Sequence, residues 1–269
     1  RDVERSRGLG DVYKRQVTLI MSQRDEWLSE MEAAAQAAAK DTGINLTTQD
    51  ANSDTSKMIQ YIESSVTAGE DAIIINMVDP ETAAQCIEAA GDVPVVFVNR
   101  FPGDPSVLNE KAVYVGSDEM TSGAFQGEFL AKFFKDQGKT DISYLMLNGI
   151  LGQTSTTNRT ASVLKALEDN GIKATAAAAP LAADYDRATA MDMISPLLKT
   201  TKYDCIISNN DAMALGAVEA MQQQGLDPKS VPIVGIDATA DGRQAIKDGT
   251  LAMTVFQNAE GQGCLLYTS

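Results

Sequence analysis

Short runs of β-branched and apolar residues alternate with amphipathic segments along the first hundred residues of the chain. We predict strands at residues 17–21, 44–49, 71–77 and 93–99. Between the first three of these runs, apolar residues recur at a spacing near 3.6, which indicates helices with one buried face. They are Trp27, Leu28, Met31, Ala34, Ala35 and Ala38 in one segment, and Met58, Ile59, Ile62 and Val66 in the next. Strands that alternate with helices predict a parallel sheet covered by helices.

The same alternation continues beyond residues 100–112, a segment rich in proline, glycine and charge that is typical of a surface connection. Further strands are predicted at 112–117, 142–148, 172–178, 205–210, 231–237 and 252–257, and helices near 119–136, 157–170, 187–199, 212–224 and 240–248. A chain of 269 residues is long enough for two units with a core each. We therefore expect an α/β fold with two doubly wound parallel-sheet lobes.

Both ends of the chain differ from its body. Residues 1–16 carry five basic and three acidic residues, whereas the chain as a whole is acidic. The stretch that ends in DVYKRQ and the closing CLLYTS resemble translated sequencing-adapter sequence. We expect residues 1–16 to be a non-native leader and residues 264–269 a non-native tail. A native signal peptide or lipid anchor and the native C-terminal segment would then be missing from this sequence.

The composition excludes several classes of function. The chain has 22 Lys and Arg against 37 Asp and Glu, a net charge of -15, so its surface would repel nucleic acid and anionic lipid. It has no histidine, the commonest metal ligand and the base of most hydrolytic triads. Cys86, Cys205 and Cys264 lack a metal-binding spacing, and no glycine-rich phosphate loop follows a strand. We expect no nucleic-acid partner, no metal, no cofactor and no enzymatic activity.

Polar and aromatic residues follow the predicted strands. In open α/β sheets, ligands bind beyond the carboxyl ends of the strands. The residues at these positions are Asp25, Trp27, Asn99, Gln153, Ser155, Arg159, Tyr185, Asn210, Asp237 and Gln257. Carboxylates and amides can bridge vicinal hydroxyls, a guanidinium donates a planar fork, and aromatic faces cover the C–H faces of a sugar ring. These ten side chains therefore suit a polyhydroxylated ligand.

Half of these residues also have a structural alternative, which the sequence leaves open. Asn210 or Asp211 could cap a helix, Asp237 and Asn99 could be turn residues, and Trp27 and Tyr185 could be half-buried at helix starts. Arg159 is different, because we predict it in the first turn of a helix, where the macrodipole disfavours a cation. Its position indicates a ligand or a carboxylate partner.

Several segments resemble the type 1 periplasmic sugar-binding proteins, and the galactose/glucose-binding branch in particular. They are INMVDP (75–80), VPVVFVNR (93–100), VYVGSDEMTSGAFQGEFLAK (113–132), SNNDAMALGAVEAM (208–221) and VPIVGIDATADG (231–242). The resemblance implies two lobes joined by a multi-strand hinge, which closes around a sugar by hinge motion. The first lobe would be residues 17–112 with 258–263 and the second 113–257, with crossings near 110–114 and 254–260.

The resemblance also implies a role for each candidate residue. Asp25 and Trp27 would contact the sugar from the first lobe, and Asn99 would lie at the mouth of that lobe. The binding loop of the second lobe would contain Gln153, Ser155 and Arg159, and Tyr185 would be the aromatic residue that stacks on the sugar. The remaining polar contacts would come from Asn210, Asp237 and Gln257. The branch has His and Asp where this chain has Gln153 and Ser155, and Trp where it has Tyr185. Its calcium loop is shortened here to residues 136–141, so no bound calcium is expected.

The function implied by the resemblance is capture of a monosaccharide, a galactose- or glucose-like hexose, and its delivery to an ABC permease in the membrane. A chemoreceptor that reads the closed form is a further partner open to such a protein. We expect a monomer in the periplasm, or a lipoprotein on the cell surface. The alternatives are the sensor domain of a sugar-responsive repressor, which needs a helix-turn-helix, and an enzyme such as a sugar isomerase or kinase.

Overall fold

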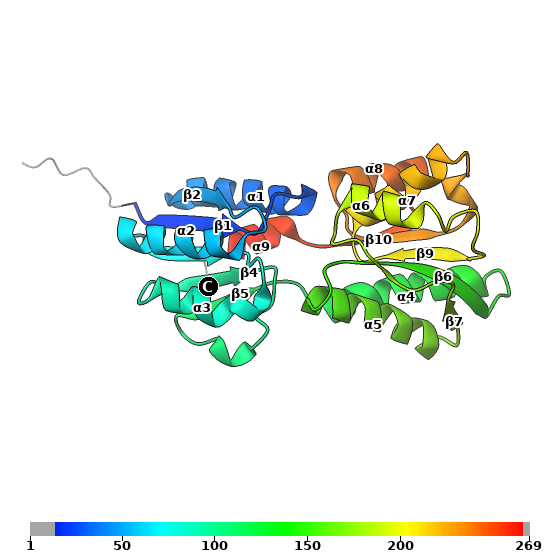
Figure 1. Cartoon of the computed structure of the whole chain (residues 1–269), viewed down its shortest axis with the longest axis horizontal. Helices are drawn as coiled ribbons and strands as arrows, with labels where there is room; N and C mark the ends of the chain where they lie inside the picture. Colours follow the sequence, from blue (N-terminus) through cyan, green and yellow to red (C-terminus); the bar gives the residue numbers. More distant parts are fainter. Residues whose placement is uncertain (1–13, 266–269) are drawn as a thin grey trace, which may run out of the picture.

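The computed structural model of the chain describes residues 14–265, which form two α/β lobes lying side by side along the longest axis of the molecule (Figure 1). Each lobe contains one sheet, and every strand pair within the two sheets is parallel. Helices cover both faces of each sheet. This arrangement confirms the predicted fold class of two doubly wound parallel-sheet lobes.

The first lobe is built on a five-stranded sheet in the order β2-β1-β3-β4-β5. Its elements are β1 (Gln16–Met21), α1 (Glu26–Thr42), β2 (Asn45–Asp50), α2 (Thr55–Ala68), β3 (Ala72–Ile75), α3 (Ala83–Ala90), β4 (Val95–Val98) and β5 (Ala112–Val115). Alternate side chains of a strand face opposite sides of the sheet. Leu19 and Met21 therefore pack with α1 while Ile20 packs with α2, and the sheet is buried on both faces.

The second lobe has the sheet order β11-β10-β9-β6-β7, with a short strand β8 paired to β6. Its elements are α4 (Glu119–Lys135), β6 (Asp141–Asn148), α5 (Thr154–Asp169), β7 (Lys173–Ala176), β8 (Leu181–Ala182), α6 (Arg187–Ile194), β9 (Cys205–Ser208), α7 (Asp211–Gln223), β10 (Ile233–Asp237), α8 (Ala240–Asp248) and β11 (Met253–Phe256). One face packs against α4 and α5, and the other against α6, α7 and α8. Because β6, β9 and β10 are neighbouring parallel strands, their carboxyl ends lie at a common edge of the sheet.

Two segments of the described chain cross between the lobes (Figure 1). One joins β5 to α4 through residues 116–118, and the other joins β11 to α9 (Ala259–Leu265) through residues 257–258. We predicted that the first lobe ends at residue 112 and crosses near 110–114. This boundary is wrong, because β5 pairs with β4 in the first sheet, and the first lobe extends to Val115. After the second crossing, α9 packs against α1 of the first lobe.

Parts of the two ends predicted to be foreign belong to regular secondary structure. Gln16, placed in the leader 1–16, is the first residue of β1 and pairs with Asn45 of β2. Cys264, placed in the tail 264–269, belongs to α9. Residues 1–13 and 266–269, which make up most of both predicted segments, lie outside the described residues. Within 14–265, no helix combines the length and apolar character needed to span a membrane.

Candidate functional site

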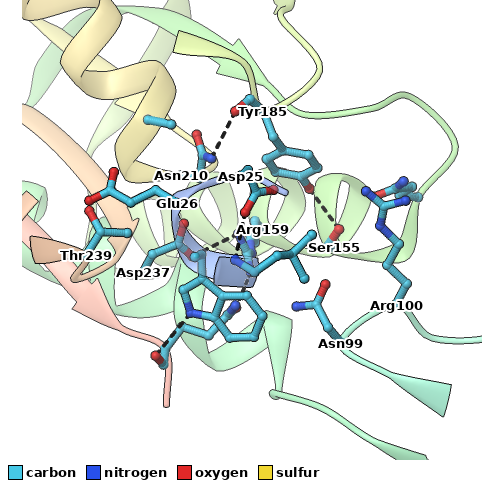
Figure 2. A pocket seen from close by; sticks show the side chains of 15 residues that line it. Asp25, Glu26, Asn99, Arg100, Ser155, Arg159, Tyr185, Asn210, Asp237 and Thr239 are labelled. Carbon is cyan, nitrogen blue, oxygen red and sulfur yellow. Dashed lines mark hydrogen bonds and ion pairs between the residues drawn. The ribbon is translucent and has the colours of Figure 1, made fainter. Parts of the chain in front are cut away.

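A pocket lies between the two lobes, and all ten candidate residues line it (Figure 2). We call it the interlobe pocket; its volume is about 530 Å³, including open solvent at its mouth. Asp25, Trp27 and Asn99 come from the first lobe, and the others come from the second lobe and the second crossing. The side chains that the sequence placed after separate strands therefore converge on one space.

The lobes touch each other across this pocket. Glu26 and Glu30 of α1 accept hydrogen bonds from the backbone N–H groups of Asp241 (3.2 Å) and Ala240 (3.1 Å) at the start of α8. The indole Nε1 of Trp27 donates to the carbonyl of Gln257 at 3.3 Å. These bonds join opposite walls of the pocket, so the structure shows the two lobes in a closed arrangement.

Asp25 both caps the helix α1 and lines the interlobe pocket. Its side chain caps α1, since Oδ1 accepts a 2.7 Å hydrogen bond from the backbone N–H of Leu28. The other oxygen has only a 3.4 Å bond from Gln23. Burial raises the pKa of the Asp25 carboxyl, and the bonds from Leu28 and Gln23 only partly oppose that shift. The oxygen that is weakly held is available to a ligand hydroxyl.

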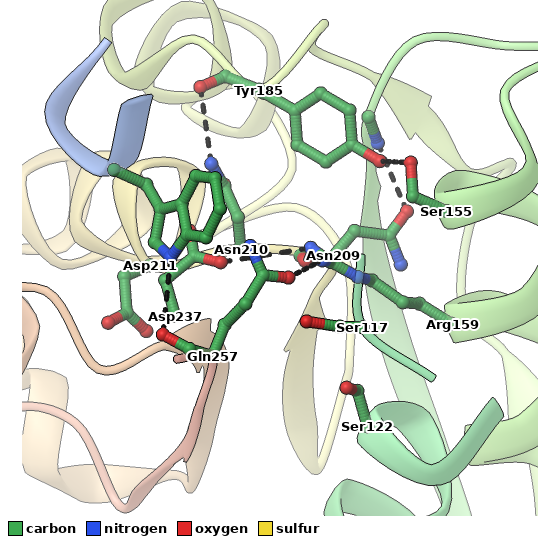
Figure 3. Close-up of polar contacts among 12 residues, drawn as sticks. Ser117, Ser122, Ser155, Arg159, Tyr185, Asn209, Asn210, Asp211, Asp237 and Gln257 are labelled. Carbon is green, nitrogen blue, oxygen red and sulfur yellow. Dashed lines mark hydrogen bonds and ion pairs between the residues drawn. The ribbon is translucent and has the colours of Figure 1, made fainter. Parts of the chain in front are cut away.

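Arg159 connects the pocket to both crossings (Figure 3). Its Nε donates to Glu119 Oε2 at 2.5 Å, and Glu119 directly follows the first crossing. One terminal nitrogen donates to the carbonyl of Asn209 at 2.7 Å, and the other to the side chain of Gln257 in the second crossing. Burial alone would lower the pKa of the guanidinium, but Glu119 and Asp237 raise it. Arg159 therefore stays charged inside the protein.

The helix position that we predicted for Arg159 is wrong. The helix α5 begins at Thr154, so Arg159 lies in its second turn and not in the first. The macrodipole effect is confined to the first turn, and it cannot explain this residue. The expected carboxylate partner is nevertheless present, in Glu119 and more distantly in Asp237, whose Oδ1 is 3.9 Å from Arg159.

Asp237 is buried at the end of β10 and lacks hydrogen-bond donors. It is 5% exposed, and no described residue donates a hydrogen bond to its carboxylate. Its φ of 122° is outside the strand region and turns the chain toward Ala238. Burial raises the pKa of this carboxyl well above its usual range, and Asp211, Asp25 and Glu119 add to the effect while Arg159 opposes it. The carboxyl oxygens line the pocket and accept no hydrogen bond within the described chain, which marks Asp237 as a place for ligand hydroxyls.

Tyr185 and the start of α5 form the upper wall of the pocket in Figure 2. The Tyr185 hydroxyl is 2.8 Å from both Ser155 Oγ and Thr156 Oγ1. Its ring packs on Gly149, where a Cβ would lie 2.0 Å from a ring carbon, so only glycine fits there. Beside this group, Gln153 is 4% exposed and its Nε2 has no hydrogen-bond partner in the part of the chain that is described. A donor is thus left unpaired in the pocket.

The structural alternatives for the remaining residues are partly correct. Asn210 does cap α7, since its Oδ1 accepts from the backbone N–H of Met213 at 3.0 Å, yet it also lines the pocket. Asn99 has a positive φ of 66°, as a turn residue would, and its Oδ1 accepts a 3.3 Å bond from Asn76. Asp211 is not the cap but the first residue of α7. Trp27 is 5% exposed and hence buried, not half-buried.

Several residues of the site were not anticipated from the sequence. Arg100, Glu26 and Thr239 line the pocket, and Glu119 and Asn209 hold Arg159. Arg100 directly follows the candidate Asn99, and Glu26 directly follows the candidate Asp25. Including the residue after each candidate would therefore have found both. Glu119 lies far from Arg159 in the sequence and has no such signal. Among the described residues, no group of three or more acidic or cysteine side chains could hold a metal ion.

The chain matches the family described as periplasmic binding protein domain over residues 17–268. It is 34% identical over 255 residues to the D-galactose/methyl-galactoside binding periplasmic protein of Haemophilus influenzae, covering 89% of this chain and 75% of that protein. The ribose import binding protein of the same organism is 28% identical over 238 residues, covering 87% and 77%. The chain belongs to the periplasmic binding protein family.

A solved structure of this family agrees with the fold. The solute-binding protein of an ABC transporter from Bacillus halodurans C-125, solved with bound myo-inositol, superposes with a TM-score of 0.80 and 30% sequence identity, covering 95% of this chain and 87% of that one. The resemblance to type 1 periplasmic sugar-binding proteins is therefore confirmed. The relatives are binding proteins by name, which confirms the prediction of a binding protein and not an enzyme.

Proposed function

We propose that this protein captures a monosaccharide in the interlobe pocket and delivers it to the permease of an ABC importer, outside the cytoplasm. The observation that carries the proposal is the set of unpaired polar groups in the pocket. Asp237 lacks donors and Gln153 Nε2 lacks an acceptor, although both are buried between the lobes. Hydroxyl groups both donate and accept, so a sugar satisfies both needs. The names of the relatives, which include galactose and ribose binders, support this ligand class.

A galactose- or glucose-like hexose is the ligand we favour. One of the relatives that are 34% identical is named for D-galactose, and the pocket offers Asp25 and Asp237 on opposite walls for hydroxyls at both ends of a ring. The similar solved structure holds myo-inositol, another six-membered polyhydroxylated ring. Ser155 supplies a neutral hydroxyl already bonded to Tyr185 where the galactose/glucose branch has a carboxylate, and this favours weaker binding than in that branch. We further propose a monomer.

A thermal-shift screen of monosaccharides and myo-inositol tests the proposal. A ligand at a hundred times its Kd adds about 2.7 kcal/mol to the free energy of unfolding. For a protein of this size that corresponds to about 5–10 °C in Tm. We expect at least one hexose to produce this shift. No shift with any sugar or cyclitol at millimolar concentration would rule out the proposed ligand class.

We expect Asp237→Asn to weaken sugar binding by about 1.5–3 kcal/mol, or about 10- to 150-fold in Kd. The reason is that the amide replaces one of the two carboxyl oxygens by an NH2 group, which donates hydrogen bonds but does not accept them. The exposed Asp248 of α8 provides the control, and Asp248→Asn should leave Kd unchanged. Calorimetric titration measures both variants. Equal affinities for wild type and Asp237→Asn would show that this carboxylate does not contact the sugar.

Sugar should shift the fluorescence of Trp27, the only tryptophan of the chain, to shorter wavelength. In the closed arrangement Trp27 is 5% exposed and bonded to Gln257 across the pocket. If the lobes separate without ligand, the bond to Gln257 is lost and water reaches the side of the indole that faces the pocket, while the other side stays packed in the first lobe. A sugar that binds by calorimetry but leaves the emission unchanged would mean that the lobes do not move relative to each other at this residue.

A further inference from the structure

A second pocket lies beside the interlobe pocket, on the side of the first crossing. We call it the hinge-side pocket; its volume is about 600 Å³, including open solvent. Phe101 and Tyr114 of the first lobe and Glu119 and Asn158 of the second lobe line it. The proposed function does not use it.

The interlobe pocket and the hinge-side pocket share part of their lining. Asn99 and Ser155 line both of them, and Figure 2 shows these two residues on the same side of the interlobe pocket. Ser155 is drawn toward Tyr185 by a 2.8 Å hydrogen bond, and Asn99 toward Asn76 by a 3.3 Å bond. A substituent on a bound ring that leaves between Asn99 and Ser155 therefore enters the hinge-side pocket.

The hinge-side pocket combines aromatic surface with an unpaired acceptor. The rings of Phe101 and Tyr114 meet edge to face with centroids 4.9 Å apart, and the Tyr114 hydroxyl donates to the carbonyl of Asn99 at 3.1 Å. Glu119 is 7% exposed; its Oε2 is held by Arg159, but its Oε1 has no hydrogen-bond partner among residues 14–265. Fixed aromatic rings and a charged acceptor favour a group that has both C–H surface and hydroxyls.

We propose that the ligand extends beyond one ring, and that a second hydroxyl-bearing group, such as another sugar ring, occupies the hinge-side pocket with a hydroxyl on Glu119 Oε1. The protein would then bind ligands of two rings, with the second ring in the hinge-side pocket, and not only free monosaccharides. This inference rests on the proposed function, since the first ring occupies the interlobe pocket. One hydrogen bond to a buried carboxylate is worth about tenfold in affinity or more, so extended ligands should bind more tightly than their parents.

Calorimetric titration of matched ligands tests the inference. D-Galactose is compared with lactose and melibiose, and D-glucose with maltose, isomaltose and cellobiose. Asn158→Phe fills the hinge-side pocket from α5, where the side chain of the wild-type Asn158 makes no hydrogen bond within the described chain. Thr157→Phe places the same ring on an exposed neighbouring position of the same helix and is the matched control. Phe101→Ala removes an aromatic wall from the first lobe and serves as a second variant if Asn158→Phe fails to fold.

We expect at least one disaccharide to bind the wild type about tenfold more tightly than its parent monosaccharide. Asn158→Phe and Phe101→Ala should each remove that advantage and leave Kd for the parent within about twofold, and Thr157→Phe should change neither Kd. If the parents bind but every disaccharide binds more weakly, or if the variants affect both ligands equally, the hinge-side pocket holds only water and the inference is wrong. If neither class of ligand binds, the proposed function itself fails.

Discussion

Replacing Arg159 by Ala is expected to destabilise the sugar-free protein by about 3–5 kcal/mol, a large share of the total stability of a typical domain. The guanidinium is 3% exposed and is bonded to Glu119, Asn209 and Gln257. Its removal leaves the carboxylates of Glu119 and Asp237 buried without a positive charge. Urea unfolding measures the loss, and sugar binding should be lost as well, because Asp237 then has no cation near it.

The control for this variant is on the same helix. Lys165 of α5 pairs with Asp169 at 2.8 Å, but both side chains are exposed. An exposed pair contributes about 1 kcal/mol or less, so Lys165→Ala should change the unfolding midpoint little. Similar midpoints for Arg159→Ala and Lys165→Ala would show that the buried network of Arg159 does not stabilise the second lobe.

Asp211→Asn is expected to change how the stability of the sugar-free protein depends on pH. Asp211 is fully buried, and burial raises the pKa of its carboxyl to about 7, against the hydrogen bonds from Thr254 (2.6 Å) and from the Thr239 backbone (3.0 Å). The folded state therefore holds a proton that the unfolded chain releases near pH 4. Stability from this group is fully present below pH 4 and is lost as pH rises through about 7.

An asparagine at position 211 resembles the protonated acid but cannot ionise. The difference in unfolding free energy, variant minus wild type, should therefore increase in favour of the variant by about 2–3 kcal/mol between pH 5 and pH 8. Asp237 and Glu26 face the same region, and both remain in the variant. The exposed Asp192 of α6 gives the control, since Asp192→Asn should leave the pH profile unchanged. Parallel profiles for wild type and Asp211→Asn would contradict a raised pKa at Asp211.

Hydrophobic spacing was sufficient to predict the two lobes but not the position of β5. The run AVYV (112–115) reads as a strand in any parallel sheet, because its apolar residues specify burial and not the neighbouring strand. Its pairing with β4 depends on contacts with distant parts of the chain, which the local sequence does not indicate. The start of α5 was missed for a related reason. Residues 154–158 (TSTTN) contain no apolar residue, and Gln153 makes no side-chain capping bond, so neither periodicity nor a cap indicated the helix.

The candidate site was more predictable, because topology alone brings the carboxyl ends of parallel strands together. All ten candidates line one pocket, yet the sequence did not reveal what holds them. Glu119 is 40 residues from Arg159, and Asp211 bonds to Thr254 across 43 residues. No rule of sequence spacing predicts hydrogen-bond partners that lie so far apart. The sequence thus predicts which residues converge at the carboxyl ends of the strands, but not which distant side chains hydrogen-bond to them.

Arg159 both lines the interlobe pocket and holds the two crossings, and this limits which positions can be mutated to change the ligand preference. Its guanidinium fastens Glu119 after the first crossing and Gln257 in the second while it also lines the interlobe pocket. A mutation there changes the mechanics of both crossings together with recognition, so most variants in a random library at this codon would be lost as unfolded protein. Gln153, Ser155 and Asn99 hold neither crossing together. Directed evolution toward other sugars should therefore diversify the codons of Gln153 and Ser155 and keep Arg159, Glu119 and Gln257 fixed, because the φ of 66° at Asn99 favours asparagine or glycine there.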